Sequence, residues 1–345
     1  MHDRKQRVKV NGNYSKWGRV PSGIPQGSVL GPLLFLIFIN DLAEFCRKDS
    51  EFYLFADDAF KYVKVESDCE KLQSNLDGLQ EWSDKWLLRL NSKKCKVISF
   101  GRQINIKHVY KLKDKDQMHD LERVETITDL GVNLDTKLSF SDHIQAKINK
   151  AYSMIGLIKR NFSSLSVSSF VMLYKSMVRS HLDYCNSVWA PYKKCDVEDL
   201  EKVQRRATKI LPALKKLTYA DRLKRCGLPT LSYRRVRGDM IETYKILSGK
   251  YDESVAPALA LNDYVSTRGN DLKLQVLNTC YELRKHFFTC RIIAYWNSLP
   301  NEVILADSTN IFKKRLDKFW QNQDIIFDYK SEITGIGNRS SSVKV

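Results

Sequence analysis

The chain has 345 residues, of which 43% are hydrophobic, so it is long enough for two or three domains and can build real cores. Lysine and arginine outnumber aspartate and glutamate by 57 to 40, which gives a formal net charge of +17. This excess attracts polyanions through counterion release, so nucleic acid is the leading class of partner and a membrane surface the second. The composition argues against a disordered chain, and the most apolar run, residues 30–39, is too short to cross a bilayer.

The first elements in chain order indicate an α/β unit. Residues 8–11 resemble a strand that ends in the turn Asn11-Gly12, and a Gly/Pro-rich loop over 22–28 leads to a helix opened by Gly31-Pro32. We expect the apolar run 30–39 to be a buried helix. Two apolar runs, 52–56 and 59–63, flank Asp57-Asp58 and predict a hairpin with acids at its tip. Helical spacing over 67–90 and a buried strand over 95–100 follow.

Beyond about residue 140 the periodicity changes to that of helices. We predict helices over 140–160, 166–180, 197–211, 231–248, 287–297 and 310–320. A linker is expected at 249–257, and a disordered tail from Ser331, where glycines and serines accumulate. Trp82, Trp86, Trp189 and Trp296 are expected in cores, because aromatic residues at these spacings usually pack inward.

The cysteines give no sign of a metal site. Eight are scattered along the chain without close pairing, at positions 46, 69, 95, 185, 195, 226, 280 and 290. Neither a zinc knuckle nor a disulfide framework is predicted, and we expect reduced, buried thiols in an intracellular protein. Cys280, His286 and Cys290 lack a fourth ligand and the usual short spacing.

The acid pair gains meaning from its surroundings. Two adjacent carboxylates on a tight turn repel each other, and both stay ionised most easily beside a cation. An Asp-Asp pair alone is weak evidence, since turns favour aspartate for backbone capping. About thirty residues upstream, however, lies Pro25-Gln26-Gly27-Ser28, whose glycine permits close approach to a ligand and whose glutamine can hydrogen-bond a nucleotide.

These residues carry a family resemblance. Residues 22–35 followed by Ile39-Asn40-Asp41-Leu42 resemble motif B of LINE-type (non-LTR) reverse transcriptases, the jockey-like branch in particular, and Phe55-Ala56-Asp57-Asp58 is similar to motif C. Residues 86–100 resemble motif D, and Leu130-Gly131-Val132 resembles the strand region that grips the primer. Similar segments follow in the helical part: Leu182-Asp183-Tyr184-Cys185, Gln204-Arg205-Arg206-Ala207 and Trp296-Asn297-Ser298-Leu299-Pro300.

The resemblance implies an RNA-directed DNA polymerase that uses two Mg²⁺ ions. Asp57 would be a direct metal ligand and Asp58 a neighbouring, less stringent one. Gln26 and Gly27 would lie against the incoming nucleotide and the template, and Lys94 near the triphosphate. The implied partners are an RNA template, a DNA primer and deoxynucleoside triphosphates, with no membrane, in a nuclear or cytoplasmic ribonucleoprotein. The chemistry would be nucleotidyl transfer to a primer 3′-hydroxyl.

One part of the family pattern is missing from the sequence. In the family another catalytic aspartate comes from motif A, upstream of the segment that corresponds to residues 3–8, so it would precede residue 1. Asp3 cannot substitute for it. We therefore expect a C-terminal fragment in which Mg²⁺ binds weakly and synthesis is lost or severely impaired. The alternative is a nucleic-acid-binding relic or domesticated protein without catalysis, and a maturase is a weaker rival.

The implied fold class is α/β: a partial right-hand polymerase palm followed by a predominantly helical thumb and C-terminal region. The expected parts are a palm segment over 1–103, a primer-grip-like strand region over 104–140, a thumb-like region over 141–250, a mostly helical region over 251–330 and the tail 331–345.

A basic stripe is predicted on the helix at 197–211. Lys202, Arg205, Arg206 and Lys209 fall on one helical face, opposite Leu200, Val203, Ala207, Ile210 and Leu211. An ordinary solvated surface and a track for the nucleic-acid backbone explain this pattern equally well. Further basic clusters favour the track: Arg222, Lys224 and Arg225, then Arg234, Arg235 and Arg237.

Overall fold

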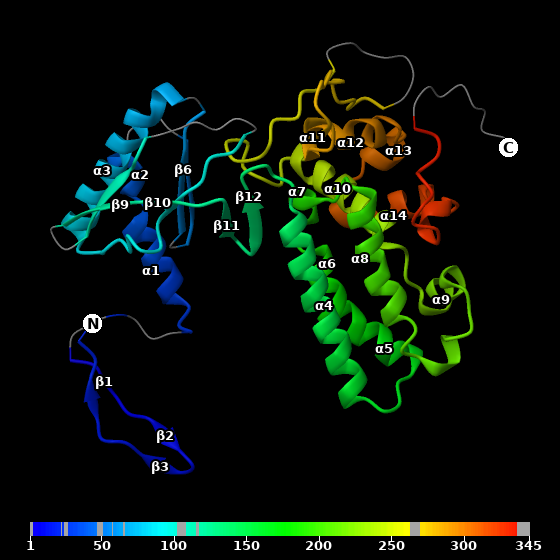
Figure 1. Cartoon of the computed structure of the whole chain (residues 1–345), viewed down its shortest axis with the longest axis horizontal. Helices are drawn as coiled ribbons and strands as arrows, with labels where there is room; N and C mark the ends of the chain where they lie inside the picture. Colours follow the sequence, from blue (N-terminus) through cyan, green and yellow to red (C-terminus); the bar gives the residue numbers. More distant parts are fainter. Residues whose placement is uncertain are drawn as a thin grey trace. The chain divides into compact units, whose positions relative to one another are not determined.

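The chain divides into two compact units, Met1–Ile127 and Thr128–Val345 (Figure 1). The computed structural model describes residues 3–21, 23, 27–46, 51–56, 58–64, 66–101, 108–114, 117–262 and 270–336. The first unit mixes strands and helices, and the second is predominantly helical. This agrees with the sequence-based expectation of an α/β part followed by helices.

The described strands pair two by two. In the first unit β1 pairs with β4, β2 with β3, β5 with β6 and β8 with β9, all antiparallel, and β7 pairs with β10 in parallel. A further pair, β11 with β12, flanks the turn Leu130-Gly131. The bounds are β1 Lys5–Gln6, β2 Lys9–Val10, β3 Asn13–Tyr14, β4 Gly18–Arg19, β5 Glu51–Phe55, β6 Asp58–Tyr62, β7 Lys96–Val97, β8 Lys111–Asp114, β9 Gln117–Asp120, β10 Glu122–Arg123, β11 Thr126–Asp129 and β12 Val132–Asp135.

A small core joins the helices of the first unit. These are α1 (Leu30–Ile39), α2 (Leu42–Phe45) and α3 (Cys69–Trp86), and the core consists of Ile39, Leu42, Cys46 and Trp82 with Phe52 of β5 packed against it. Gly78 of α3 lies directly against the Phe45 carbonyl of α2, so a Cβ at this position would collide with backbone. Both indoles of α3 donate to one carboxylate: Trp82 Nε1 to Asp41 Oδ1 at 2.7 Å and Trp86 Nε1 to Asp41 Oδ2 at 2.9 Å.

Two expectations for this unit are wrong. Helix α1 forms where it was predicted, but it is not a buried helix: Leu33, Leu36 and Ile37 are 54%, 58% and 66% exposed. The strand expected over 95–100 shrinks to the two half-buried residues of β7. Composition predicted burial in both places, because an apolar run shows that a segment can be buried without showing what covers it.

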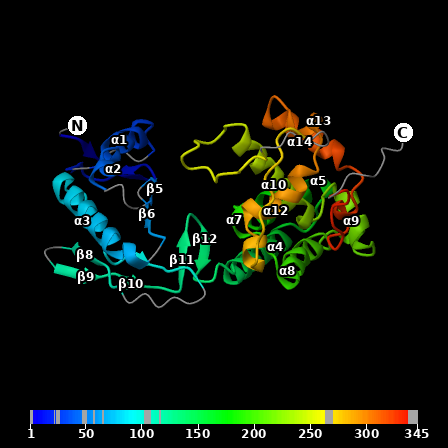
Figure 2. The same cartoon turned by 90° about the horizontal axis from the view of Figure 1, so that it is seen from above.

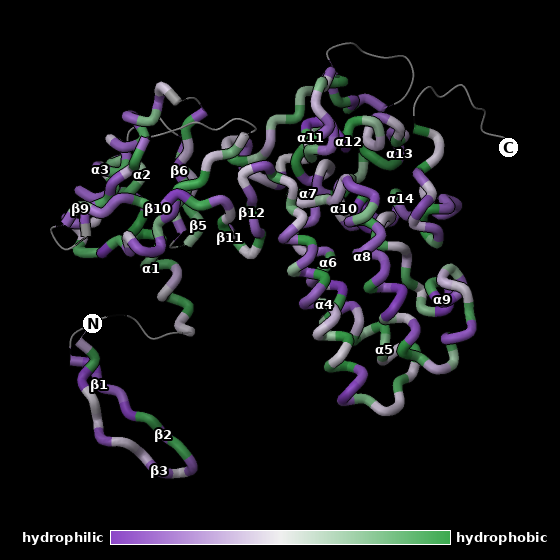
Figure 3. The backbone as a smooth tube through the Cα atoms, in the orientation of Figure 1, coloured by the Kyte–Doolittle hydropathy of each residue, from purple (hydrophilic) through white to green (hydrophobic). Residues whose placement is uncertain are grey.

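The second unit is built from amphipathic helices whose hydrophobic and hydrophilic residues alternate along the backbone (Figure 3). Ser166, Thr218, Thr230 and Ser308 each cap a helix by accepting a backbone N–H with the side chain. The helices are α4 (Ser141–Asn161), α5 (Val167–Leu173), a π-helical segment (Tyr174–Arg179), α6 (Ser180–Asp183), α7 (Asn186–Trp189), α8 (Lys194–Ala207), α9 (Tyr219–Cys226), α10 (Leu231–Leu247), α11 (Glu282–Lys285), α12 (Phe288–Asn297), α13 (Asn301–Ile304) and α14 (Thr309–Phe319).

Two hydrophobic cores hold this unit together. Helices α4 and α8 contact each other in the first core, which includes the buried Trp189, and α10, α12 and α14 enclose the second around Trp296 (Figures 1 and 2). Trp82, Trp189 and Trp296 are therefore core residues as predicted, whereas Trp86 is 40% exposed. The expected disordered tail is wrong for residues 331–336, since Ile333 is buried in the second core and Thr334 bonds Gln323; residues 337–345 lie outside the described residues.

The structure also tests the expectations for the cysteines and for membrane-spanning helices. All eight cysteines are free thiols, but only Cys46, Cys69 and Cys226 are buried, so the expectation of core thiols holds for three of them. Among the described residues, no helix combines the length and apolar character needed to cross a bilayer.

Candidate functional site

The predicted hairpin around the acid pair forms. Strands β5 and β6 pair antiparallel over five residue pairs, and Asp58 is the first residue of β6, opposite Phe55. Ala56 occupies the left-handed region at φ +52°, which turns the chain sharply between the strands. Asp58 is exposed, and Asp57 lies outside the described residues. The carboxylate of Asp58 is thus presented to solvent at a tight turn and not turned into an apolar interior.

Contacts with the helices fix the position of this hairpin. Lys61 of β6 donates to Oδ1 of Asn75 at 3.0 Å, and Asn75 is a buried residue of α3. Phe52 of β5 packs on the core, while Tyr53 and Tyr62 stack across the strands at 6.1 Å between ring centroids. Cross-strand pairs of this kind stabilise a two-stranded ribbon that would otherwise be marginal. The turn that bears Asp58 is therefore held from both strands.

The described residues alone do not form a magnesium cage. Among them, no group of three or more His, Cys, Asp or Glu side chains is arranged to hold a metal ion. Mg²⁺ demands near-octahedral oxygen coordination, and Asp58 offers a single carboxylate. Among the described residues the donor set at this turn is therefore incomplete for two ions, and Asp57 lies outside these residues.

The other two elements of the predicted site lie on loops of the same unit. Gly27 has φ +82° and open space around its Cα, whereas Gln26 lies outside the described residues. Ser28 Oγ accepts the Gly31 amide at 3.1 Å and so caps α1. Lys94 closes a turn through its amide, 2.9 Å from the Asn91 carbonyl, and its side chain is exposed. No described hydrogen bond or ion pair joins Asp58, Gly27 and Lys94 to one another.

The basic stripe forms with one change. The apolar face of α8 is buried as predicted, and Lys202, Arg206 and Lys209 are exposed, although the helix ends at Ala207 and Lys209 follows it. Arg205 is half-buried: its Nη2 donates to the Tyr329 hydroxyl at 2.8 Å, and its guanidinium lies near the rings of both Tyr219 and Tyr329. This residue borders a cavity of about 390 Å³ that Phe327 and Lys330 also line.

In the further basic clusters Lys224 and Arg225 are exposed, whereas the four remaining arginines are buried or half-buried, which corrects the assignment of these four to a track. Arg222 and Arg235 are buried, at 3% and 7% exposure. Arg237 forms a two-pronged pair with Asp317. Charge counting could not reveal this, because Asp317 lies 80 residues away along the chain.

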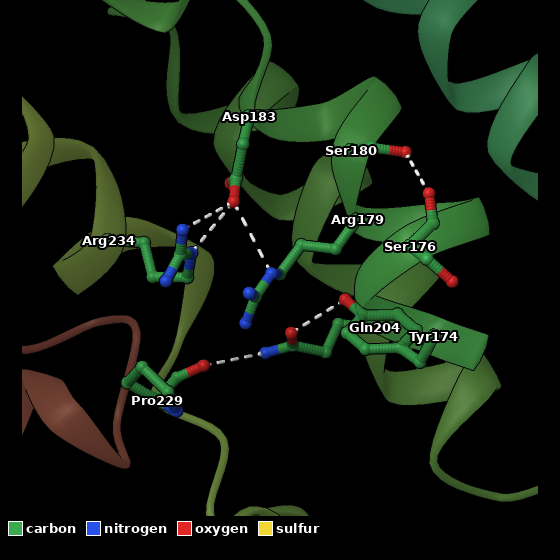
Figure 4. Close-up of polar contacts among 8 residues, drawn as sticks. All are labelled: Tyr174, Ser176, Arg179, Ser180, Asp183, Gln204, Pro229 and Arg234. Carbon is green, nitrogen blue, oxygen red and sulfur yellow. Dashed lines mark hydrogen bonds and ion pairs between the residues drawn. The ribbon is translucent and has the colours of Figure 1, made fainter. Parts of the chain in front are cut away.

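Instead, a buried polar network joins the helices of the second unit (Figure 4). The side chain of Gln204 accepts from the Tyr174 hydroxyl at 2.6 Å and donates to the Pro229 carbonyl at 3.0 Å. Beside it, Glu201 is fully buried and accepts the Leu231 amide at 3.0 Å and the Tyr219 hydroxyl. Burial raises the pKa of the Glu201 carboxyl.

Asp183 is the second centre of this network. It accepts from Arg234 at 2.8 Å and pairs with Arg179 at 3.4 Å, which ties α6 to α10 (Figure 4). Asp183 and Gln204 belong to two of the segments quoted for the family resemblance. The structure gives both a role in packing that no sequence signal revealed, because their partners lie in distant segments.

Comparison with known proteins finds a family match in the N-terminal part of the chain. Residues 4–134 match the family described as Reverse transcriptase (RNA-dependent DNA polymerase). The chain is 30% identical over 217 residues to the RNA-directed DNA polymerase from mobile element jockey of Drosophila melanogaster, an alignment that covers 59% of this chain and 23% of the relative. The Drosophila funebris jockey polymerase is 30% identical over 200 residues, covering 54% and 21%. The polymerase ascribed to transposon X-element of Drosophila melanogaster is 25% identical over 231 residues, covering 61% and 24%.

These alignments cover less than a quarter of the length of each of the three relatives. No solved structure matches the chain significantly. The aligned segment includes the hairpin with Asp57-Asp58 and the loop with Gln26-Gly27. Residues 4–134 are therefore similar to the reverse transcriptase family, and the chain is similar to the RNA-directed DNA polymerases of jockey elements.

Proposed function

We propose that this polypeptide is a segment of an RNA-directed DNA polymerase of a non-LTR retrotransposon. The observation that carries the proposal is the exposed Asp58 on a tight hairpin turn, inside the part of the chain that matches the reverse transcriptase family. The substrates are deoxynucleoside triphosphates, an RNA template and a DNA primer. The protein's task in nucleotidyl transfer is mainly to position metals and substrates, which requires side chains on rigid supports such as this hairpin.

Within this proposal each site residue has one task. Asp57 and Asp58 contribute to the metal site, Gln26 and Gly27 contact nucleotide and template, and Lys94 stabilises charge on the leaving pyrophosphate. Gly27 suits its task because it has no side chain and lies in open space, and Lys94 because its ammonium group is exposed. When bound, Mg²⁺ would supply Lewis-acid stabilisation of the transferred phosphoryl group.

The second unit serves as the helical thumb and C-terminal region, and the exposed Lys202, Arg206 and Lys209 contact the nucleic-acid backbone. Arg205 supports this surface through its bond to Tyr329. The exposed cations favour this role because phosphates attract them without regard to sequence. In the same scheme residues 1–103 are the palm segment, 104–140 the primer grip and 141–250 the thumb.

Primer extension tests the proposal. Because the aspartate pair is only part of a magnesium cage, we expect synthesis by this polypeptide to be severely reduced or absent, and any residual synthesis to require Mg²⁺ and Asp57. The assay uses an RNA template, a DNA primer and all four deoxynucleotides, with Asp57→Asn and Asp58→Asn as variants. Robust synthesis that depends on Asp57 would contradict the expected impairment, and synthesis in both variants would contradict the site.

A second candidate function is nucleic-acid binding without catalysis. It is favoured by the formal net charge of +17, which attracts nucleic acid whether or not a metal is bound. This function predicts an RNA affinity that is the same with and without Mg²⁺ and the same in Asp58→Asn. A Mg²⁺-dependent affinity that Asp58→Asn abolishes would exclude it.

A further inference from the structure

The hairpin formed by residues 5–19 separates its charged side chains from its neutral ones onto two faces, except for Lys16, which lies between the paired registers. Its strands pair with two registers: Lys5 with Arg19 and Gln6 with Gly18, then Lys9 with Tyr14 and Val10 with Asn13. Between these registers, residues 7 and 8 oppose the three residues 15–17, so the second strand contains a one-residue bulge. Directly opposed residues share a face, and alternate residues along a strand share one.

Because of the bulge, the charged and aromatic residues at alternate positions of the first strand lie on the same side as those of the second strand. We name this side the cationic face; it consists of Lys5, Arg7, Lys9, Tyr14, Trp17 and Arg19. Ring contacts support the assignment, because the Arg7 guanidinium lies 3.9 Å from the Tyr14 ring centroid and 4.6 Å from that of Trp17. The opposite, neutral face consists of Gln6, Val8, Val10, Asn13, Ser15 and Gly18.

The cationic face is exposed and short of counter-charges. Trp17 and Tyr14 are 60% and 52% exposed. Lys5 is directly opposite Arg19, and such like-charged pairs destabilise a ribbon. Among the described residues, the acidic residue beside this face is Asp3, which pairs with Arg19 at 3.0 Å; both side chains are largely exposed, where an ion pair is weak. The arrangement therefore favours a polyanionic ligand that supplies the missing negative charges.

From this segregation of charge we propose that the cationic face binds the phosphodiester backbone of a nucleic acid. A guanidinium that lies against two rings is ordered before binding and presents its planar donors to phosphate oxygens. A two-stranded ribbon also fits the major groove of duplex DNA, and exposed Trp17 could stack an unpaired base. The inference rests on nucleic acid being the partner in the proposed function, and it assigns contacts to residues outside the Asp58 site.

The test compares the salt dependence of binding in matched variants of the full chain. Lys5→Gln with Lys9→Gln removes two charges; a face-swap variant adds Gln6→Lys and Val10→Lys, which restores the net charge on the opposite face. We expect the first variant to lower the slope of log affinity against log salt by about 1.4 for single-stranded RNA and about 1.8 for duplex DNA, at roughly 0.7 and 0.9 per phosphate contact. The face-swap variant should remain as weak as the first. Since all four positions are solvent-exposed, thermal unfolding should stay unchanged.

An unchanged slope in the first variant, or recovery of affinity in the face-swap variant, would overturn the proposal. The proposal would also be overturned if the same substitutions weakened binding to phosphatidylserine vesicles as much as binding to nucleic acid, because the face would then bind anions in general. Trp17→Leu separates the two nucleic-acid sources. If the variant loses about tenfold in affinity for single-stranded RNA and none for duplex DNA, Trp17 stacks on an unpaired base. If the variant binds both nucleic acids as tightly as the unsubstituted chain, the face binds a duplex. None of these variants alters Asp58, so failure here leaves the primer-extension test of the proposed function intact.

Discussion

We predict that His143 makes the stability of the second unit depend on pH. This residue of α4 is fully buried, its Nδ1 accepts the Asn133 amide at 3.0 Å, and its ring lies 5.1 Å from that of Trp189. Its enclosed Nε2 has no acceptor among the described residues. Burial, with a smaller contribution from Lys147, lowers the pKa of His143 from 6.5 to about 4. The folded state therefore holds the neutral imidazole, while the unfolded state takes up a proton near pH 6.5.

The sign and size of the effect follow from linkage. Because the folded pKa is depressed, the unfolded chain binds more protons as pH falls, and stability is lost between about pH 6.5 and about pH 4. A shift of 2.5 pKa units corresponds to about 3 kcal/mol in full, and between about pH 7 and pH 5 to about 2 kcal/mol. This is a large fraction of the stability of an ordinary domain.

Urea unfolding followed by the helical circular dichroism signal measures this difference. The control is His143→Asn, whose side-chain oxygen can replace Nδ1 as the acceptor for Asn133 but does not titrate. We expect the unsubstituted chain to lose about 2 kcal/mol more than the variant between about pH 7 and pH 5. Equal losses in both proteins would refute the reasoning, because a solvated or ion-paired imidazole would show no such difference.

Two further predictions concern hydrogen bonds between polar side chains. Asp41→Ala leaves the indole donors of Trp82 and Trp86 without their acceptor, and we expect the free energy of unfolding of the first unit to fall by about 1–3 kcal/mol, measured by tryptophan fluorescence. Asp41→Asn keeps a side-chain oxygen and should lower it less. Equal losses in the two variants would contradict a stabilising role for these two hydrogen bonds. In the unsubstituted chain the guanidinium of Arg291 donates two hydrogen bonds to the Asp239 carboxylate, at 2.8 and 2.9 Å. Asp239→Ala removes this carboxylate, and we expect the free energy of unfolding in urea to fall by about 3–5 kcal/mol. Combining Asp239→Leu with Arg291→Met should recover most of this loss, and failure to recover would show that packing dominates.

Local patterns predicted the elements well where one signal determined them. The hairpin of β5 and β6 follows from two apolar runs around a polar turn, and α4, α10, α12 and α14 begin and end within a residue of the expected positions. Burial was predicted less well, since the exposed Leu36 and Ile37 of α1 have the same composition as a core helix. Composition shows which side chains favour burial, whereas tertiary contacts determine which of them are buried.

The candidate site was predictable in part. Motif spacing predicted that an acid pair would lie on a hairpin turn, and Asp58 does, with Asp57 and Gln26 outside the described residues. The internal role of Arg222 and the network around Gln204 could not be predicted, because their partners lie elsewhere in the sequence. The cationic face was also missed, because it depends on a bulge that shifts Tyr14 to the side of Lys9, and a bulge is invisible to strict alternation.

The central claim is that residues 4–134 contribute the Asp57-Asp58 turn to a nucleotidyl-transfer site. The most direct measurement replaces the aligned segment of the jockey polymerase with residues 4–134 and follows RNA-templated primer extension by the chimera. We expect synthesis that Asp57→Asn abolishes and Asp58→Asn reduces. A chimera that still binds primer and template but extends the primer equally well with both aspartates replaced would contradict the claim.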